Sequence, residues 1–206
     1  MTFSGSASSS AQFPRDGLPE VAFLGRSNVG KSSLLNALAG AKGLARVSSS
    51  PGRTRLINFF NVKGLGKSAR GGHSELYLVD LPGYGYAKAS RSAREEWERL
   101  VNSYLEARET LRLCVFIVDA RHEPSEGDQT LRTWLDHHGH PYVVAANKID
   151  KLGRDAGRRR ARSLGETIGP CAEAVVPVSA TKGTGIGELW NHIRAAAFDR
   201  PFEASV

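Results

Sequence analysis

One stretch of the chain combines glycines, a lysine and a serine at the spacing of a phosphate-binding loop. It fits G-x-x-x-x-G-K-[ST] and consists of Gly25, Arg26, Ser27, Asn28, Val29, Gly30, Lys31 and Ser32. Its glycines let the backbone point successive N–H groups at phosphate oxygens. Lys31 can reach the β- and γ-phosphates of a nucleotide, and the Ser32 hydroxyl can bind Mg²⁺. An apolar run before the loop and a helix-forming run after it favour this interpretation over a glycine-rich turn with an incidental lysine.

A second stretch follows another apolar run and consists of Asp80, Leu81, Pro82 and Gly83. An aspartate at the end of such a strand can hold Mg²⁺ through a water molecule. A glycine three residues later can offer its N–H to the γ-phosphate and move away once that phosphate is gone. The alternative is a strand that ends in a Pro-Gly turn, but a phosphate loop upstream favours the functional interpretation.

A third stretch is suited to reading a guanine base and consists of Asn147, Lys148, Ile149 and Asp150. The Asp150 carboxylate can accept hydrogen bonds from guanine N1–H and from the exocyclic amine, a donor pair that adenine lacks. Asn147 can reach the other edge of the base and brace the phosphate loop, while the Lys148 stem covers the ring face. After the last apolar run, a backbone N–H can meet guanine O6 from the segment formed by Ser179, Ala180 and Thr181.

A hydroxyl group, that of Thr54, lies between the phosphate loop and the next apolar run. At this distance from the loop it can complete the coordination of Mg²⁺ when the γ-phosphate is present. Together with Asp80, it would hold the Mg²⁺-bound nucleotide in the GTP state of a two-state switch. A simple Pro-Gly turn at residues 51–52 is the alternative.

A regular framework must position these polar stretches, and the hydrophobic pattern predicts one. Apolar runs predict strands at 21–24, 56–62, 75–80, 113–119, 142–146 and 174–178. Helix-forming runs predict helices at 33–39, 92–107, 129–138, 155–167 and 187–198. This alternation predicts an α/β fold, a doubly wound, mostly parallel six-stranded sheet with helices on both faces and the ligand at the carboxyl ends of the strands. The glycine-rich link 63–74 is longer than a hairpin needs and predicts a mobile loop.

The composition fits a single domain. The chain has 206 residues, and no apolar run approaches the ~20 residues of a membrane span. Residues 1–12 lack the features of a signal peptide, so we expect a disordered tail at 1–17, a nucleotide-binding domain at 18–200 and a short tail at 201–206. Cys114 and Cys171 are expected to be reduced thiols of a cytoplasmic protein. The net charge of +7 favours a polyanionic partner, either RNA or an acidic membrane surface.

With these motifs in place, the chain resembles the EngB (YihA/YsxC) family of GTPases. The likeness rests on residues 21–36, 50–54, 56–60 and, most distinctively, 80–87, and it extends from about Pro19 to about Phe198. It implies a Ras-like P-loop GTPase that hydrolyses GTP to GDP and phosphate. It also implies a monomeric assembly factor that binds the RNA and proteins of the large ribosomal subunit and is needed for normal cell division and septation. Ser50, Arg55 and Asn147 depart from the residues that we expect in this family.

The resemblance implies roles for individual residues. The loop 25–32 would bind the phosphates, while Asn147, Lys148 and Asp150 would bind guanine. Mg²⁺ would be bound by Ser32, Thr54 and Asp80, and catalysis would involve Lys31, Thr54 and Gly83. Further nucleotide contacts are expected from Gly52, Arg53, Arg55, Leu56, Leu81, Pro82, Ile149, Ser179, Ala180 and Thr181.

Intrinsic hydrolysis is expected to be slow and to be stimulated by a partner. Tyr84 occupies the position at which Ras-type enzymes carry a water-orienting glutamine, and a phenol lacks the paired donor and acceptor of an amide. GTPases with a hydrophobic residue at this position often use a K⁺ ion that is held partly by a P-loop asparagine. Asn28 occupies the matching position. Two roles are therefore open for Asn28, holding K⁺ or only bracing the loop.

Two features are candidates for contact with RNA. A basic run holds Lys151, Arg154, Arg158, Arg159, Arg160 and Arg162 against a single acid, Asp155. It can contact RNA phosphates, or it can be a solvated helix face. Tyr84 and Tyr86 can stack on RNA bases, or one of them can serve in the core or in a turn.

Two other classes of function compete with the assembly factor. A P-loop phosphotransfer enzyme would share the loop 25–32, but the base-reading stretch 147–150 argues against it. A division-site scaffold would bind GTP and recruit septation proteins, although nothing in the sequence resembles a membrane anchor. Sedimentation with 50S particles in the presence of a GTP analogue or of GDP separates the scaffold from the assembly factor.

Overall fold

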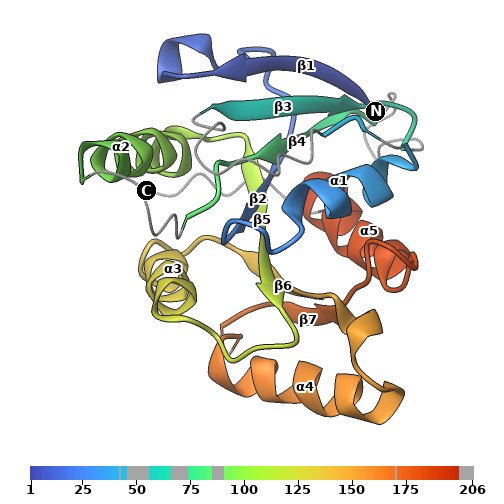
Figure 1. Ribbon diagram of the computed structural model, residues 1–206. Helices are drawn as coiled ribbons and strands as arrows, with labels where there is room; N and C mark the ends of the chain where they lie inside the picture. The colour runs from blue at the N-terminus through green and yellow to red at the C-terminus, as the bar shows by residue number, and fades with distance from the viewer. Residues whose placement is uncertain (42, 46–55, 66–73, 85–90, 170, 200–206) are drawn as a thin grey trace.

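The structure, a computed structural model, describes residues 1–41, 43–45, 56–65, 74–84, 91–169 and 171–199 (Figure 1). The strands are β1 Thr2–Ala7, β2 Glu20–Gly25, β3 Ile57–Val62, β4 Leu76–Asp80, β5 Leu111–Asp119, β6 Tyr142–Asn147 and β7 Ala174–Pro177. The helices are α1 Lys31–Ala39, α2 Arg91–Ala107, α3 Glu126–His137, α4 Arg154–Thr167 and α5 Ile186–Arg194, with short helical turns at η1 Ser10–Gln12, η2 Ile149–Lys151 and η3 Ala195–Asp199. Each strand and helix that the sequence predicted is present. Most of the predicted mobile loop, residues 66–73, lies outside the described ranges. None of the helices in these ranges has the length and apolar character needed to cross a lipid bilayer.

The strands form one sheet in the order β1-β3-β4-β2-β5-β6-β7. β2 pairs in parallel with β4 on one side and with β5 on the other, and β6 and β7 continue the parallel part. β3 runs antiparallel to β4. After β2 the chain forms β3 and β4 on one side of β2 and then crosses to β5 on the other side. This reversal makes the end of β2 the topological switch point, where sheets of this kind bind ligands. The predicted doubly wound, mostly parallel sheet is confirmed.

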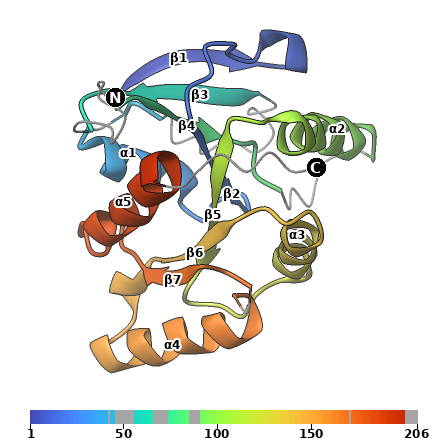
Figure 2. The same cartoon turned by 180° about the vertical axis from the view of Figure 1, so that it is seen from behind.

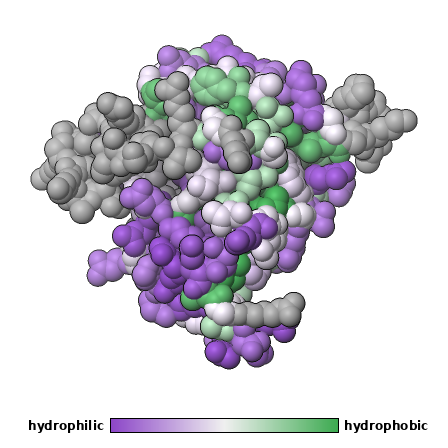
Figure 3. Space-filling view, turned by 45° about the vertical axis from the view of Figure 1, so that its right-hand side comes forward, coloured by the Kyte–Doolittle hydropathy of each residue, from purple (hydrophilic) through white to green (hydrophobic). Residues whose placement is uncertain are grey.

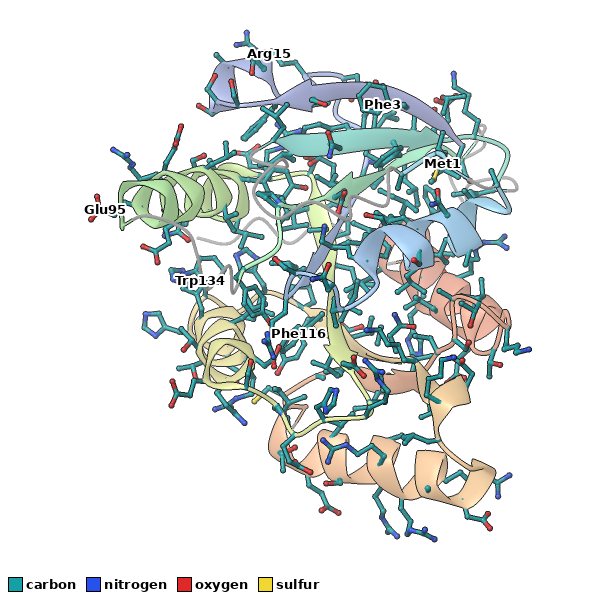
Figure 4. All side chains as sticks on the ribbon, in the orientation of Figure 1. Met1, Phe3, Arg15, Glu95, Phe116 and Trp134 are labelled. Atoms are coloured by element: carbon teal, nitrogen blue, oxygen red, sulfur yellow. The ribbon has the colours of Figure 1, made fainter. Side chains whose placement is uncertain are left out.

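Helices cover both faces of the sheet, as the two opposite views show (Figures 1 and 2). One face packs against α1 and α5 through Leu34, Leu35, Leu189 and Ile193. The other face packs against α2, α3 and α4 through Tyr104, Leu105, Leu135, Leu164 and Ile168. Phe116 of β5 lies inside this second layer (Figure 4). Successive residues of β2 alternate between the two layers, which explains why the strand reads as a continuous apolar run.

The N-terminal residues correct the prediction of a disordered tail and of six strands. Thr2–Ala7 forms β1, which pairs antiparallel with β3 and adds a seventh strand. Without β1, the backbone N–H and C=O groups along one side of β3 would lie at the edge of the sheet. Phe3 packs edge-on against Phe60 with ring centroids 5.7 Å apart (Figure 4), and the Ser6 hydroxyl donates to Asn58 at 2.6 Å. Backbone pairing together with such side-chain contacts therefore orders a segment whose composition is poor in apolar residues.

A buried carboxylate connects β2, α2 and the N-terminal segment. Glu20 is fully buried and accepts hydrogen bonds from the hydroxyls of Tyr104 at 2.7 Å and Thr110 at 2.9 Å. The Arg108 guanidinium forms an ion pair with Glu20 and donates to the Pro14 carbonyl at 3.0 Å. Burial and the neighbouring Glu20 charge raise the pKa of Tyr104 well above its usual value, so its hydroxyl remains a donor.

Replacing Arg108 by alanine should lower the free energy of unfolding by about 3 kcal/mol, because the Glu20 carboxylate would stay buried without its counter-charge. Urea denaturation measures this change. Arg99→Ala on α2, the helix that ends just before Arg108, is the matched control, since Arg99 is exposed and donates to the Glu95 carbonyl of its own helix at 3.3 Å. The control should change stability by less than about 0.5 kcal/mol. Equal losses in the two variants would contradict the role inferred for the Glu20 network.

Candidate functional site

The phosphate loop connects β2 to α1, where the sequence predicted it. Gly25 closes β2 at a point without room for a side chain, since an added Cβ would lie 2.8 Å from the Ile117 carbonyl oxygen. Asn28 and Gly30 have φ values of 64° and 101°, in the left-handed region that turns the backbone around. Gly30 caps α1 without a side chain, and the first turn of α1 carries no acid. The first N–H groups of the helix and its positive dipole end are therefore left for an anion.

The loop carbonyls are held from the outside by the residues predicted to read a base. The Asn147 amide donates to the Val29 carbonyl at 2.9 Å, and the Lys148 ammonium donates to the Asn28 carbonyl at 2.9 Å. The predicted brace between Asn147 and the loop is thus present. An added side chain at Gly30 would collide with the Asn147 amide. The Asn147 Oδ1 is buried and has no partner among the described residues, which leaves polar capacity for a ligand at this position.

Asp119 anchors Lys148 and was missed in the sequence. The Lys148 ammonium also donates to the Asp119 carboxylate at 2.9 Å, and Arg121 holds the same carboxylate with bonds of 2.8 and 2.9 Å. Burial raises the pKa of Asp119, but the hydrogen bonds from Arg121 and Lys148 outweigh it and hold this pKa well below its usual range. Asp119 ends β5 directly opposite Asn147, which ends β6. The convergence of parallel strand ends at one edge of the sheet was the signal that could have indicated it.

Asp150 is held in a defined position as a hydrogen-bond acceptor. Ser179 is fully buried, and its hydroxyl donates to the Asp150 carboxylate at 2.6 Å. This hydrogen bond is the main reason why the pKa of Asp150 is lowered, so the side chain is ionised at neutral pH. The Ser179 N–H donates to the Thr184 carbonyl at 3.0 Å. The N–H groups of this segment that can meet a base are therefore those of Ala180 and Thr181.

The segment after β4 lies directly against the phosphate loop. The Asp80 carboxylate forms an ion pair with the Lys31 ammonium, and the two side chains are only 7% and 11% exposed. The Ser27 N–H donates to the Tyr84 carbonyl at 2.9 Å. Gly83 fits here because an added Cβ would lie 3.1 Å from the Ser27 nitrogen and from the carbonyl oxygen of the first loop glycine. A side chain at position 83 would therefore push the two segments slightly apart.

The other predicted nucleotide contacts divide into two groups. Leu81 and Ile149 pack against the hydrophobic core, so their contribution is to position their neighbours. Arg26 is exposed, Pro82 is buried, and Leu56 is 39% exposed just before β3. The predictions for Gly52, Arg53, Thr54 and Arg55, and the role considered for Tyr86, fall outside the described residues.

The donor set at the phosphate end fits a magnesium-bound nucleotide. Ser32 is the second residue of α1, and Asp80 is the last residue of β4. Their hydroxyl and carboxylate oxygens are hard donors of the kind that Mg²⁺ takes beside nucleotide phosphates. Lys31, the neighbour of Ser32, supplies a positive charge at the same place.

The basic run on α4 does not present all of its arginines to solvent. Arg160 turns inward, where its guanidinium donates to the Ala120 carbonyl at 3.1 Å and pairs with Glu123. Arg158, Arg159 and Arg162 are exposed on the outer side of α4. This helix lies at the lower end of the molecule in Figure 1, and Figure 3 shows hydrophilic residues beside smaller apolar patches at this end. The sequence grouped Arg160 with the other arginines, because a charge run does not reveal which member has a partner far along the chain.

Known proteins resemble this chain in sequence and in fold. A family model described as "50S ribosome-binding GTPase" matches residues 20–148. A relative in Solibacter usitatus, named "Probable GTP-binding protein EngB", is 48% identical over 88% of this chain and 87% of its own. The crystal structure of a probable GTP-binding protein engB has a TM-score of 0.65 at 23% identity, covers 88% of this chain and 99% of that one, and supports the fold alone. Era, solved with MgGDPNP and part of 16S ribosomal RNA, has a TM-score of 0.69 at 26% identity over 92% of this chain and 59% of Era.

Replacing Asp119 by asparagine should weaken the binding of GDP about three- to tenfold, because Lys148 loses its charged anchor and keeps the Asn28 carbonyl. Isothermal titration calorimetry measures this change.

The lowered pKa of Asp119 sets the pH dependence of this anchoring. The carboxylate contributes at every pH above its ordinary pKa and loses its effect only as the pH falls through the lowered one. From about pH 8 to pH 5 its anchoring of Lys148 should therefore stay constant.

Glu123→Gln is the matched control for this substitution. Glu123 is 78% exposed in the loop after β5, so its replacement makes the same change in charge without touching Lys148. An equal loss of GDP affinity in the two variants would show that net charge is responsible, and the anchoring role of Asp119 would be wrong.

Proposed function

This chain belongs to the EngB family of GTP-binding proteins and is a P-loop GTPase, and from this premise we propose that it is a nucleotide-switched assembly factor for the large ribosomal subunit. The matching family model, described as a 50S ribosome-binding GTPase, supports this choice of particle. The proposed factor acts in the cytoplasm as a monomer. Normal cell division and septation would then depend on it through the supply of large subunits.

The observation that carries the proposal is the direct hydrogen bonding between the two ends of the site. Asn147 and Lys148 donate to the carbonyls of Val29 and Asn28, so the base-reading residues and the phosphate loop form one continuous unit. Asp150, fixed by Ser179, offers acceptors that match the two donors of guanine. A site of this kind distinguishes guanine nucleotides by their base and by the number of their phosphates.

The proposed switch consists of the segments that contain Asp80 and Thr54. Ser32, Asp80 and Thr54 would hold Mg²⁺, which when bound neutralises negative charge on the phosphates. Lys31 would leave Asp80 to contact the phosphates, and the Gly83 N–H would donate to the γ-phosphate. Loss of the γ-phosphate would release both segments, and this release is the signal that a partner reads.

The proposed intrinsic hydrolysis is slow and stimulated by a partner. The Tyr84 hydroxyl donates to Asp128 at 2.5 Å, so it is directed toward α3. A phenol held in this way does not orient the attacking water as a glutamine amide does. The role of Asn28 in holding K⁺ stays a prediction, and equal turnover in K⁺ and Na⁺ buffers would contradict it.

The predicted interaction depends on the nucleotide. In a sucrose gradient, the protein should migrate with purified 50S subunits when a non-hydrolysable GTP analogue is present and should remain at the top of the gradient with GDP. Free 30S subunits serve as the control for general affinity for RNA. Binding to 50S subunits that is equal in the two nucleotides, or that is equal on 30S and 50S subunits, would contradict the proposal and favour a scaffold of another kind.

We propose that the exposed arginines of α4 contact ribosomal RNA phosphates. Reversing Arg158 and Arg162 to glutamate should reduce the slope of log affinity against log salt by about 1.5, the effect of two lost phosphate contacts. The matched control reverses Arg99 on α2 and Arg194 on α5, which are also exposed, and makes the same change in net charge. An unchanged slope in the α4 variant, or the same change in the control, would identify the run as a solvated face.

A further inference from the structure

Tyr84 connects three parts of the molecule. Its backbone carbonyl accepts hydrogen bonds from the Ser27 N–H at 2.9 Å and from the Ser27 hydroxyl at 3.2 Å. Its side-chain hydroxyl donates to the Asp128 carboxylate at 2.5 Å. Since Asp128 lies in the first turn of α3, a single residue links the segment 80–84 with the phosphate loop and with this helix.

The α3 end of this connection is preorganised. Asp128 is buried, and its second oxygen accepts hydrogen bonds from the Ser125 N–H at 2.7 Å and the Ser125 hydroxyl at 2.6 Å. The Ser125 hydroxyl also accepts from the Asp128 N–H, which completes a capping box. The Tyr84 ring lies against Gly127, where an added Cβ would be 3.1 Å from a ring carbon. Burial and the Asp128 charge raise the pKa of Tyr84, so its hydroxyl remains a donor at physiological pH.

The groups held in this arrangement are those that a triphosphate needs. A P-loop binds phosphates through its backbone N–H groups and its lysine. Here the Ser27 N–H donates to Tyr84, and the Lys31 ammonium donates to Asp80. Because Lys31 also reaches the β-phosphate, its pair with Asp80 must open for either nucleotide. The γ-phosphate is the group that meets the segment 80–83, so a triphosphate must in addition displace the Tyr84 contacts. A diphosphate does not reach this segment and can bind while the Tyr84 contacts remain intact.

We propose that Tyr84 is a positioning residue whose bond to Asp128 latches the segment 80–84 onto the phosphate loop, and that GTP must open this latch. The proposal rests on the nucleotide switch of the proposed function. It adds that the Tyr84–Asp128 pair sets the equilibrium between the GDP-binding and GTP-binding states. A ligand shifts an equilibrium only by its differential affinity for the two states. The free energy needed to open the latch therefore weakens the binding of GTP. The affinity for GDP is unchanged, because GDP binds with the latch closed.

Tyr84→Phe tests the latch because it removes the hydroxyl and keeps the ring against Gly127. The measurement is the ratio of the dissociation constants of GDP and a non-hydrolysable GTP analogue, by calorimetry. This ratio should shift about tenfold toward the GTP analogue, the effect of losing one hydrogen bond to a carboxylate in the latched state. A merely structural role for Tyr84 would instead lower the melting temperature and leave the ratio where it is.

Tyr142→Phe is a matched control, because the Tyr142 hydroxyl also donates to an aspartate of α3. The Tyr142 hydroxyl donates to Asp136 at 2.9 Å near the far end of α3, so this variant loses the same kind of bond away from the phosphate loop. Its ratio should equal that of the wild type. An unchanged ratio in Tyr84→Phe, or the same shift in Tyr142→Phe, would overturn the latch.

A double-mutant cycle gives a second, independent readout. Asp128→Asn alone should shift the ratio in the same direction as Tyr84→Phe, and the double variant should shift it no further than Tyr84→Phe does. Additive shifts would overturn the proposal. If 50S binding by the wild type proves independent of nucleotide, the proposed function fails, whereas the affinity ratio still decides for or against the latch.

Discussion

A phosphate loop can point its N–H groups inward only if its carbonyl groups find partners on the outer side. In this protein the partners come from the loop itself and from across the sheet. The Arg26 carbonyl accepts from the Val29 N–H at 3.2 Å, the Asn28 carbonyl from Lys148, and the Val29 carbonyl from Asn147. The shape of the loop therefore depends on residues that lie more than a hundred positions further along the chain. Base recognition and phosphate recognition are coupled because the same two side chains serve both.

The parallel part of the sheet makes this coupling possible. β2, β4, β5 and β6 end at the same edge, and each of them places a polar group or a loop there. Their apolar residues are locked between two layers of helices, so the strand ends hold their positions. The rigid side of the site comprises the P-loop, Asp119 and Asn147. Tyr84, at the end of the segment 80–84, is held by hydrogen bonds to Ser27 and Asp128. These bonds can open without disturbing the sheet, which suits a site that has to change with its ligand.

The sequence was sufficient for the features that depend on local pattern. The apolar periodicity indicated the helices and the strands after residue 18, and the glycine spacing indicated the phosphate loop. What it did not reveal depends on contacts between distant residues. Phe13, in the expected tail, packs 5.5 Å from the Tyr104 ring and 5.9 Å from the Phe59 ring. The partners of Lys148, Tyr84 and Arg160 follow from strand register and helix placement, which a single sequence does not specify.

The pairing of β1 with β3 has a consequence for how the chain is made. The paired residues of β1 lie between 50 positions (Ala7 to Ile57) and 59 positions (Thr2 to Asn61) from their partners. A nascent chain that leaves the ribosome N-terminus first must therefore carry this segment unpaired until β3 has been synthesised. Contacts of such separation form late, because closing a long loop costs entropy before any pairing is gained. β1 is thus among the last strands to join the sheet, although it is translated before β3, the strand with which it pairs.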